Sequence, residues 1–317
     1  MTVTADSTQL LYDLEPVVTE NLNRHLAAAK EWMPHEYVPW SQGRDYADLG
    51  GEPWNPEQSR LSPILRTALE VNLLTEDNLP SYHREIERAF GQDGAWGTWV
   101  NRWTAEEGRH AYCIRDYLLV TRGVDPEHLE QTRMQVMQVG YNSDPQDKPA
   151  LRVLAYVAFQ ELATRISHRN TGRHTEDPIA ERLLTRVATD ENLHMVFYRN
   201  LIKAALELAP GATLRAITDE VAAFQMPGTV IPGFTRKAAQ IAKAGIYDLR
   251  IHHDDVLWPL LRHWQVFDLG GLDAQGEQAR TELDTFLAQL NAQASRFEER
   301  RAEANARAEA RAVSAQA

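Results

Sequence analysis

The most restrictive feature of this sequence is a pattern of acids and histidines that occurs twice. "RWTAEEGRHA" contains Glu107 and His110, and "ATDENLHMVF" contains Glu191 and His194. Residues three apart on a helix lie on one face, so each motif would present a carboxylate and an imidazole to the same neighbour. One Glu-x-x-His arises readily by chance in a charged helix, whereas two copies in one chain are far less expected. The pattern therefore requires at least two long helices.

Each motif is also preceded, at a similar interval, by an isolated glutamate in an apolar helical stretch. These are Glu76 in "NLLTEDNLPSY" and Glu161 in "YVAFQELATR". Solvent-exposed acids would be an alternative, but a carboxylate inside "YVAFQELA" would be costly if it were buried and unpaired. Four carboxylates and two imidazoles from four helices form the ligand set of ferritin-like bundles with two iron or manganese ions. The predicted metal ligands are Glu76, Glu107, His110, Glu161, Glu191 and His194.

Apolar residues recur at three- and four-residue spacing over most of the chain, and alternating strand patterns are scarce. The fold class predicted is all-α, a ferritin-like four-helix bundle extended by further helices. Residues 1–274 are expected to form a single domain, and 275–317 a helical extension that is frayed or disordered from about residue 300. The clearest helical stretches are 61–74, 151–166 and 181–209.

Composition excludes several classes of protein and site. Cys113 is the only cysteine, so no disulfide and no thiolate cage can form within the chain. The formal charge of −12 argues against a nucleic-acid partner. No apolar run reaches the length of a membrane span, and the N-terminus lacks the features of a secretory signal. A cytoplasmic protein that does not span a membrane is therefore expected.

Two acids stand directly before metal ligands and suggest an outer layer around the site. The pseudo-twofold pattern predicts that Asp190 contacts His110 and that Glu106 contacts His194, since metal-bound histidines usually donate their free ring N–H to a carboxylate. Glu106 could instead face solvent or pair with an arginine. Thr164, one turn after Glu161, would point into the same cavity or bond back to its own helix.

Other residues have ordinary explanations. Pro80 would free the Glu76 carbonyl and kink that helix, or simply mark a helix break. Cys113 is expected to pack in the core. The remaining histidines lack a partner pattern and are expected to be structural or exposed: His25, His35, His83, His128, His168, His174, His252, His253 and His263.

Over about residues 9 to 272 the chain resembles the soluble acyl-carrier-protein desaturases, especially their mycobacterial DesA-type members. The strings that carry this resemblance are "WMPHEYVPW", "LTEDNLPSYHREI", "RWTAEEGRHA", "FQELATRISHRNTG" and "DENLHMVFYR". The resemblance implies that Glu107 and Glu191 bridge two irons and that Thr164 assists oxygen activation or proton delivery. It further implies a relay from Trp32 through Asp190 toward His110. Leu193 departs from the basic residue that plant members carry before the second histidine.

The function implied by the resemblance is O2-dependent desaturation of a saturated acyl chain carried on acyl carrier protein. Electrons would come from reduced ferredoxin or a similar donor, and the protein would be a homodimer. Manganese could replace iron. The alternatives are another oxygen-activating diiron protein of the R2-like oxidase type, and a catalytically silent scaffold that binds acyl carrier protein. Arg236, Lys237 and Lys243 in "GFTRKAAQIAKAG" are a candidate dock for the acidic carrier, or else a solvated helix face.

Overall fold

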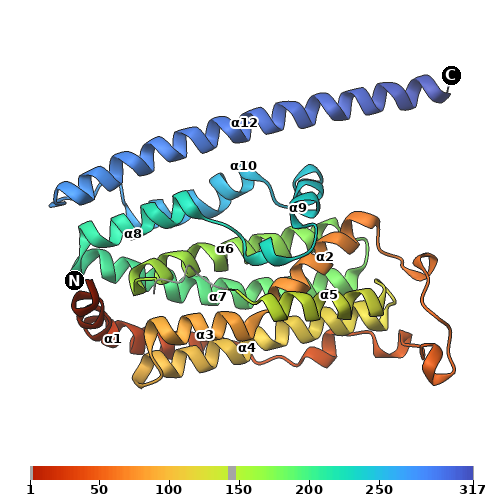
Figure 1. Cartoon of the computed structure of the whole chain (residues 1–317), viewed down its shortest axis with the longest axis horizontal. Helices are drawn as coiled ribbons and strands as arrows, with labels where there is room; N and C mark the ends of the chain where they lie inside the picture. The colour runs from red at the N-terminus through yellow and green to blue at the C-terminus, as the bar shows by residue number, and fades with distance from the viewer. Residues whose placement is uncertain (1–2, 142–147, 317) are drawn as a thin grey trace.

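The computed structural model describes residues 3–141 and 148–316, and within these ranges the regular structure is helical, without a strand (Figure 1). Short 3₁₀ turns lie between the first two helices and before α9. A three-residue helix, α10 (Leu249–Ile251), continues into a π-helical turn, η6 (His252–Leu257). The other helices are α1 (Val3–Ala28), α2 (Pro63–Glu76), α3 (Leu79–Phe90), α4 (Gly94–Val120), α5 (Pro126–Val139), α6 (Ala150–His174), α7 (Pro178–Leu208), α8 (Pro210–Ala223), α9 (Phe234–Lys243), α11 (Trp258–Trp264) and α12 (Ala274–Gln316).

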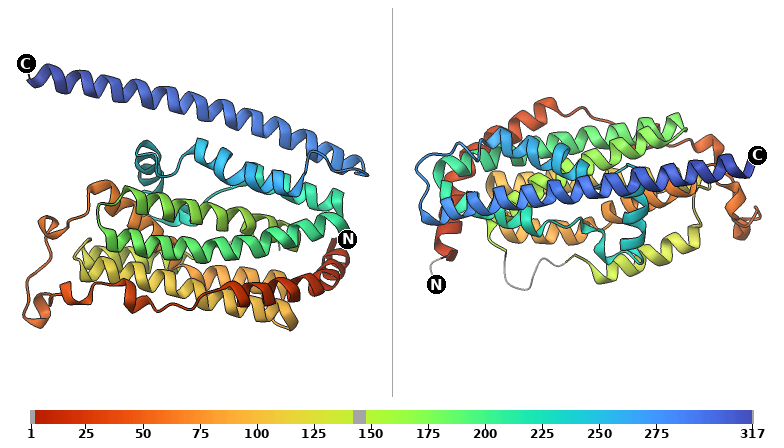
Figure 2. Two further views of the ribbon diagram at one scale, coloured as in Figure 1. Left: turned by 180° about the vertical axis from the view of Figure 1, so that it is seen from behind. Right: turned by 90° about the horizontal axis from the view of Figure 1, so that it is seen from above.

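The helices are stacked in layers that keep the centre of the molecule dry. α2, α4, α6 and α7 form the central bundle, and α3 continues from α2 along α4 (Figures 1 and 2). α1 packs on the outer side of α4 and α7. On the opposite side, α8 and η6 cover α6, α9 packs on α2, and α12 lies across α8. Among the described residues no helix is both long enough and apolar enough to cross a bilayer.

Local capping explains where the bundle helices begin. The side chain of Ser62 accepts a hydrogen bond from the Leu65 amide at the start of α2, and Asp177 accepts one from the Ile179 amide at the start of α7. A proline follows each cap, which suits the first helical turn because its missing N–H would be unpaired there. These signals fix the register in which α7 presents its acids and histidine.

A break separates α2 from α3 directly after Glu76. Asp77 and Asn78 form a turn, and Pro80 stands in the first turn of α3. Because proline has no N–H, it cannot bond the Glu76 carbonyl four residues earlier, so the helix cannot continue unchanged through this point. Of the two outcomes expected for Pro80, the structure has the helix break, and Glu76 is the last residue of α2.

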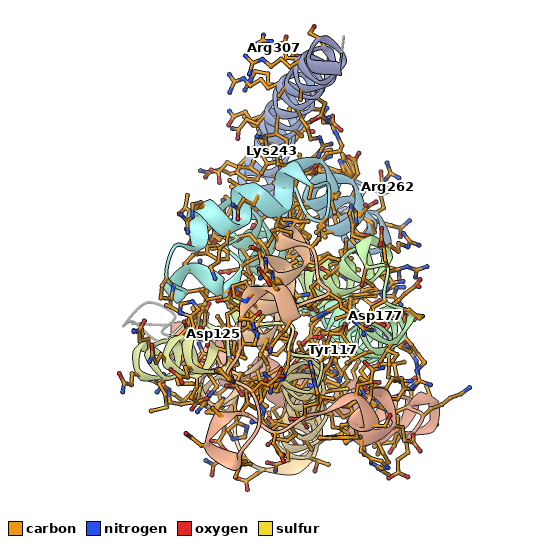
Figure 3. All side chains as sticks on the ribbon, turned by 90° about the vertical axis from the view of Figure 1, so that its right-hand side faces the viewer. Tyr117, Asp125, Asp177, Lys243, Arg262 and Arg307 are labelled. Atoms are coloured by element: carbon orange, nitrogen blue, oxygen red, sulfur yellow. The ribbon has the colours of Figure 1, made fainter. Side chains whose placement is uncertain are left out.

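The C-terminal extension is a single helix, α12. This helix continues as far as Gln316 and so includes the end that was expected to be frayed or disordered from about residue 300. Arg301 still reaches back to Asp248, at 2.6 Å between Nη1 and Oδ2. Beyond it the described side chains, Arg307 among them, are exposed and project past the bundle (Figure 3). Alanine, glutamate and arginine favour a helix without any core to pack on. The buried apolar side chains of α12 are Ala279, Leu283, Leu287, Leu290 and Ala294.

Candidate metal centre

The six predicted ligands converge at the centre of the bundle, and all of them are buried. Glu76 comes from the end of α2, and Glu161 from the middle of α6. α4 and α7 each contribute one Glu-x-x-His motif. Four helices therefore present their chemically reactive side chains to one another rather than to solvent.

The ligand atoms fall into two overlapping groups. One contains Glu76, Glu107, His110 and Glu191, and the other contains Glu107, Glu161, Glu191 and His194, with one donor atom of each residue within 4.8 Å of the others. Glu107 and Glu191 belong to both groups. This sharing is the arrangement that two carboxylates bridging two metal ions require.

Both histidines turn the same ring nitrogen toward the acids. Nδ1 of His194 is 2.8 Å from Oε1 of Glu107 and 3.4 Å from Oε2 of Glu161. Nδ1 of His110 is 3.3 Å from Oε1 of Glu191. The opposite nitrogen, Nε2, points away from the four predicted ligand carboxylates in each case. Nδ1 would therefore be the metal-binding atom, and Nε2 is free to bond the surrounding protein.

The pocket holds several buried acids close together, and a bound cation would compensate their charge. Burial, and then the charge of Glu191, raises the pKa of Glu107. Burial likewise raises the pKa of Glu161 well above its ordinary value, with the carboxylates of Glu191 and Glu107 adding to the effect. Desolvated like charges are unfavourable, and bound cations reverse this balance.

Hydrogen bonding supports the same assignment. Several buried donor and acceptor atoms of the site form no hydrogen bond within the described part of the chain, although buried polar atoms normally do. Apart from Nε2 of His110, which faces Asp190, they are Oε1 of Glu107, Nδ1 of His110, Oε2 of Glu161, Oε1 of Glu191 and Nδ1 of His194. All five belong to predicted ligands and lie inside the two groups. The donor set of carboxylates and imidazoles suits iron or manganese.

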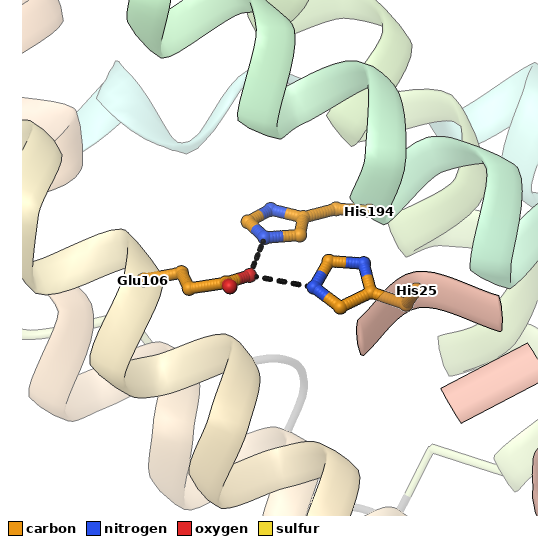
Figure 4. Close-up of side chains that lie close together, drawn as sticks. All are labelled: His25, Glu106 and His194. Carbon is orange, nitrogen blue, oxygen red and sulfur yellow. Dashed lines mark hydrogen bonds and ion pairs between the residues drawn. The ribbon is translucent and has the colours of Figure 1, made fainter. Parts of the chain in front are cut away.

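An outer layer of contacts holds the second histidine. The N–H at Nε2 of His194 donates to Oε2 of Glu106 at 2.9 Å, as the pseudo-twofold pattern predicts. The same oxygen accepts a hydrogen bond from Nε2 of His25, also at 2.9 Å (Figure 4). The other carboxylate oxygen is paired with Arg102. Glu106 therefore contacts both a histidine and an arginine, so two of the options weighed for it occur together.

The corresponding contact at the first histidine is longer. Nε2 of His110 lies 3.6 Å from Oδ2 of Asp190, an ion-pair distance that exceeds a direct hydrogen bond. Oδ2 accepts instead from the indole N–H of Trp32 at 2.7 Å, and Arg186 and Arg109 bind the same carboxylate. The chain from Trp32 to Asp190 is thus formed, and its last step toward His110 is wider than its counterpart at His194.

Thr164 does both things expected of it. Its hydroxyl lies 2.9 Å from Oε2 of Glu191, and it is 3.1 Å from the carbonyls of Gln160 and Glu161. Since a hydroxyl has one hydrogen, it can donate to only one of these acceptors at a time. The hydroxyl can therefore switch between its own helix and a ligand carboxylate.

Three further side chains belong to this outer layer and were not predicted to do so, and two of them hydrogen-bond predicted ligands directly. The ring of His168 bonds Oε1 of Glu76 at 2.7 Å, and the indole N–H of Trp103 donates to Oε1 of Glu161 at 2.9 Å. His25 reaches the site through Glu106. His25 and His168, which were expected to be structural or exposed, are buried and hydrogen-bonded at the edge of the site. His168 stands two turns after Glu161 and Trp103 one turn before Glu107, so helical spacing could have indicated both. Cys113 is buried beside the Pro34 carbonyl and packs as expected.

A cavity opens between α3 and α6 and ends at this pocket. Its inner wall includes Glu76, Glu107 and Thr164. Ile86, Val153 and Val157 supply much of its apolar surface. Tyrosines and charged side chains stand along the rest of its wall: Tyr82, Tyr141, Tyr156, Glu85 and Lys148. A slender, mostly apolar ligand could thus reach the two ligand groups from the surface.

The bundle and its carboxylate-rich centre define a ferritin-like protein with a candidate two-metal site, so the predicted all-α fold is confirmed. The family model described as Fatty acid desaturase matches residues 6–315, and the chain belongs to this family. DesA1 of Mycobacterium tuberculosis, which bears the name of an acyl-[acyl-carrier-protein] desaturase, is 48% identical over 296 residues, or 92% of this chain and 88% of DesA1.

More distant relatives extend the comparison. Stearoyl-[acyl-carrier-protein] 9-desaturase 5 of Oryza sativa is 28% identical over 310 residues, which are 92% of this chain and 78% of the rice protein. The X-ray structure of DesA2 from Mycobacterium tuberculosis matches with a TM-score of 0.70 at 32% identity, covering 86% of this chain and 99% of the DesA2 chain. The resemblance read from the sequence is therefore confirmed at the level of the family.

Metal binding is expected to stabilise the fold. Adding ferrous iron without oxygen to metal-free protein should raise the melting temperature by roughly 5 °C or more, because a ligand that binds only the folded state at concentrations well above its dissociation constant stabilises it by a few kcal/mol. Calorimetry measures the shift. Calcium, which prefers a larger oxygen-only shell, serves as the control. Equal shifts with both ions would contradict a site built from carboxylates and imidazoles.

Proposed function

We propose that the protein is an acyl-[acyl-carrier-protein] desaturase, which introduces a double bond into a saturated acyl chain with O2 as the oxidant. The observation that supports this most directly is the cavity that ends at Glu76, Glu107 and Thr164. An acyl chain threaded into it would place methylene groups beside both groups of ligand atoms. The names and activities of the relatives point to the same substrate class.

The proposed cofactor is a pair of iron ions. Glu76 and His110 would hold one ion, Glu161 and His194 the other, and Glu107 and Glu191 would bridge them. When bound, the irons would supply the O2 chemistry that removes a hydrogen from each of two adjacent methylenes. Manganese suits the same carboxylates and imidazoles and could replace iron.

Electrons and protons balance only with an external reductant. The acyl chain gives up two hydrogen atoms, which supply two electrons and two protons to O2, and two further electrons and two protons come from elsewhere, giving an alkene and two waters. A lone buried cysteine offers no redox pair within the chain. We therefore propose reduced ferredoxin or a similar carrier as the electron donor. We also propose that the protein is a homodimer and that it works in the cytoplasm.

The protein's own side chains orient and isolate the reaction. The apolar wall formed by Ile86, Val153 and Val157 excludes water from the acyl chain. Trp103 holds the Glu161 carboxylate by its indole N–H. The Thr164 hydroxyl, which lines the cavity and reaches Oε2 of Glu191, is positioned to hold or pass a proton between the cavity and that carboxylate.

The candidate carrier dock on α9 lies close to the cavity. α9 packs on the 3₁₀ turn η5 (Pro227–Val230), and Pro227 lines the cavity. Arg236 and Lys243 are exposed, whereas Lys237 already pairs with Glu70 at 2.8 Å. Two of the three predicted cations are thus available to an acidic carrier protein.

Reversing those two charges is expected to weaken carrier binding. The variant Arg236→Glu with Lys243→Glu should raise KM for acyl carrier protein several-fold and flatten its dependence on salt, since rim charges act mainly through long-range attraction. Steady-state kinetics measure both. Turnover of the same acyl group on a short pantetheine thioester is the control and should not change. Unaltered kinetics with acyl carrier protein would show that it does not bind at Arg236 and Lys243.

The proposed function is tested by reconstitution. Iron-loaded protein is supplied with acyl carrier proteins of several chain lengths, ferredoxin, its reductase, NADPH and O2, and the products are analysed by mass spectrometry. A loss of two mass units from one chain length supports the proposal. Oxygen consumption without an alkene would favour an R2-like oxidase. Carrier binding without oxygen consumption would favour a silent scaffold.

A further inference from the structure

A cluster of cationic side chains covers the surface where α1, α7 and α11 meet. It consists of Arg24, Arg199, Lys203, Arg262 and His263; Arg24, Lys203 and Arg262 are exposed and the other two are half-buried. Within the described ranges, none of the five has an acidic group within the 4.0 Å of an ion pair, and Arg262 is stacked on Trp258. Nε of Arg199 and Nε2 of His263 are buried without a hydrogen bond in that part of the chain.

This basic face is held in place by hydrogen bonds beneath it. Asn200 donates to the side chain of Asn21 at 2.7 Å, which fixes α1 on α7. The indole N–H of Trp264 donates to the Arg199 carbonyl at 2.8 Å, which fixes α11 on α7. Arg24, Arg199 and His263 each lie within three residues of one of these bonds. The cations are therefore gathered by the packing of the helices.

The cations also destabilise one another. Burial, and then the charge of Arg24, lowers the pKa of Arg199, and burial together with Arg199 and Lys203 lowers the pKa of His263. The chain as a whole carries a formal charge of −12, so a cluster of cations with no acid at ion-pair distance in the described structure stands out. An anionic surface bound here would relieve the repulsion.

The basic face leads inward to the candidate metal centre. His25, next to Arg24, bonds Glu106, and Glu106 bonds His194, with both contacts at 2.9 Å (Figure 4). The rings of His25 and His194 are stacked with centroids 5.7 Å apart. Two hydrogen bonds therefore span the distance from a surface helix to a predicted metal ligand.

We propose that the basic face of Arg24, Arg199, Lys203, Arg262 and His263 is the docking surface for an acidic one-electron carrier protein, which delivers electrons along His25, Glu106 and His194. The proposal rests on the proposed function for the need for electrons. Two successive encounters supply the two electrons, and one donor molecule is oxidised at each. No net proton transfer through the chain is required.

A different partner for this face, and a different route for the electrons, both fit less well. The acyl carrier protein must sit over the cavity, yet none of the residues that line the cavity in the described structure comes from α1, α7 or α11. The second route, through Trp32, has arginines nearby, but Arg109 and Arg186 already bind Asp190 and stack on the Trp32 ring. In the described part of the chain the basic face combines cations that have no acid at ion-pair distance with a path of two hydrogen bonds to His194.

Binding of a plant-type [2Fe–2S] ferredoxin to the iron-loaded protein, measured by calorimetry at several salt concentrations, tests the dock without requiring turnover. Arg24→Glu combined with Lys203→Glu should raise Kd about tenfold or more and flatten its salt dependence. Arg60→Glu combined with Arg173→Glu makes the same charge change near the opposite end of α7 and should leave Kd within about twofold. An unchanged Kd in the first variant, or equal losses in both, would overturn the proposal.

The path is tested by stopped-flow reduction at saturating ferredoxin. His25→Phe should keep its iron and its Kd for ferredoxin yet slow reduction by the protein donor about tenfold, while reduction by dithionite stays normal. Slower reduction in Trp32→Phe together with an unchanged rate in His25→Phe would overturn the path and favour the Trp32 side. If the variant Arg24→Glu with Lys203→Glu binds acyl carrier protein more weakly but binds ferredoxin normally, the face is not the docking surface for the electron carrier. Failure of the desaturase proposal itself would appear separately, as absence of alkene in every variant including the unaltered chain.

Discussion

Replacement of Glu107 by alanine is expected to abolish binding of both irons. Glu107 is one of the two carboxylates that belong to both groups of ligand atoms, so its removal takes a donor from each ion and leaves Nδ1 of His194 without its nearest acidic neighbour. His194→Ala should weaken the binding of only one iron ion, the one that His194 and Glu161 would hold. Iron content per chain and the near-ultraviolet absorption of oxo-bridged iron measure the two losses.

The control is Glu181→Ala, which removes an exposed acid from α7 and should leave iron content unchanged. Melting temperatures of the metal-free variants separate loss of metal from loss of fold. Removing one of several crowded carboxylates lowers their mutual repulsion, so metal-free Glu107→Ala should be no less stable than the unaltered metal-free protein. A full complement of iron in Glu107→Ala would refute the bridging assignment.

Asp190→Asn is expected to keep its iron and lose about tenfold or more in turnover, within the range typical of residues that hold metal ligands in place. The substitution preserves shape but removes the charge that faces His110 at 3.6 Å and that holds Arg109 and Arg186. The matched change on the other side is Glu106→Gln, at the hydrogen-bonded histidine. Its effect should be at least as large, because its contact with His194 is shorter, at 2.9 Å.

Turnover and iron content in both variants check this prediction, and the melting temperature reports any loss of packing. Asp190→Asn with unaltered turnover would remove the Trp32 and Asp190 relay from the mechanism without affecting the six ligands. A larger loss in Asp190→Asn than in Glu106→Gln would show that the longer contact is nevertheless the more important one.

The convergence of the metal ligands could be predicted from sequence because it depends on local periodicity. A glutamate and a histidine three apart must share a helix face, and that face must be covered by other helices if the neighbouring residues are apolar. The second layer required knowledge of packing. His25 reaches Glu106 only because α1 lies across α4 and α7, and nothing in the sequence around His25 specifies that crossing.

The sequence pattern could not predict that His110 lies farther from Asp190 than His194 lies from Glu106. The pseudo-twofold repeat treats Asp190 and Glu106 as equivalent, but a shorter aspartate side chain drawn by Arg186, Arg109 and Trp32 stays farther from its histidine than the longer glutamate does. Which side chains compete for one carboxylate depends on rotamers and on helix crossings. The repeat predicted which residues approach one another, and not their final distances.

Each group of ligand atoms combines helices from both halves of the chain, because Glu191 lies with Glu76 and His110, and Glu107 lies with Glu161 and His194. During synthesis, the first half of the chain therefore leaves the ribosome without a complete site for either ion. The group with His110 lacks its last member until residue 191 has emerged, and the group with His194 until residue 194 has, so metal loading would be a late step in biogenesis. In cells short of iron, full-length chains would accumulate with their acids brought together and uncompensated, and these chains would be the first to reach the degradation machinery.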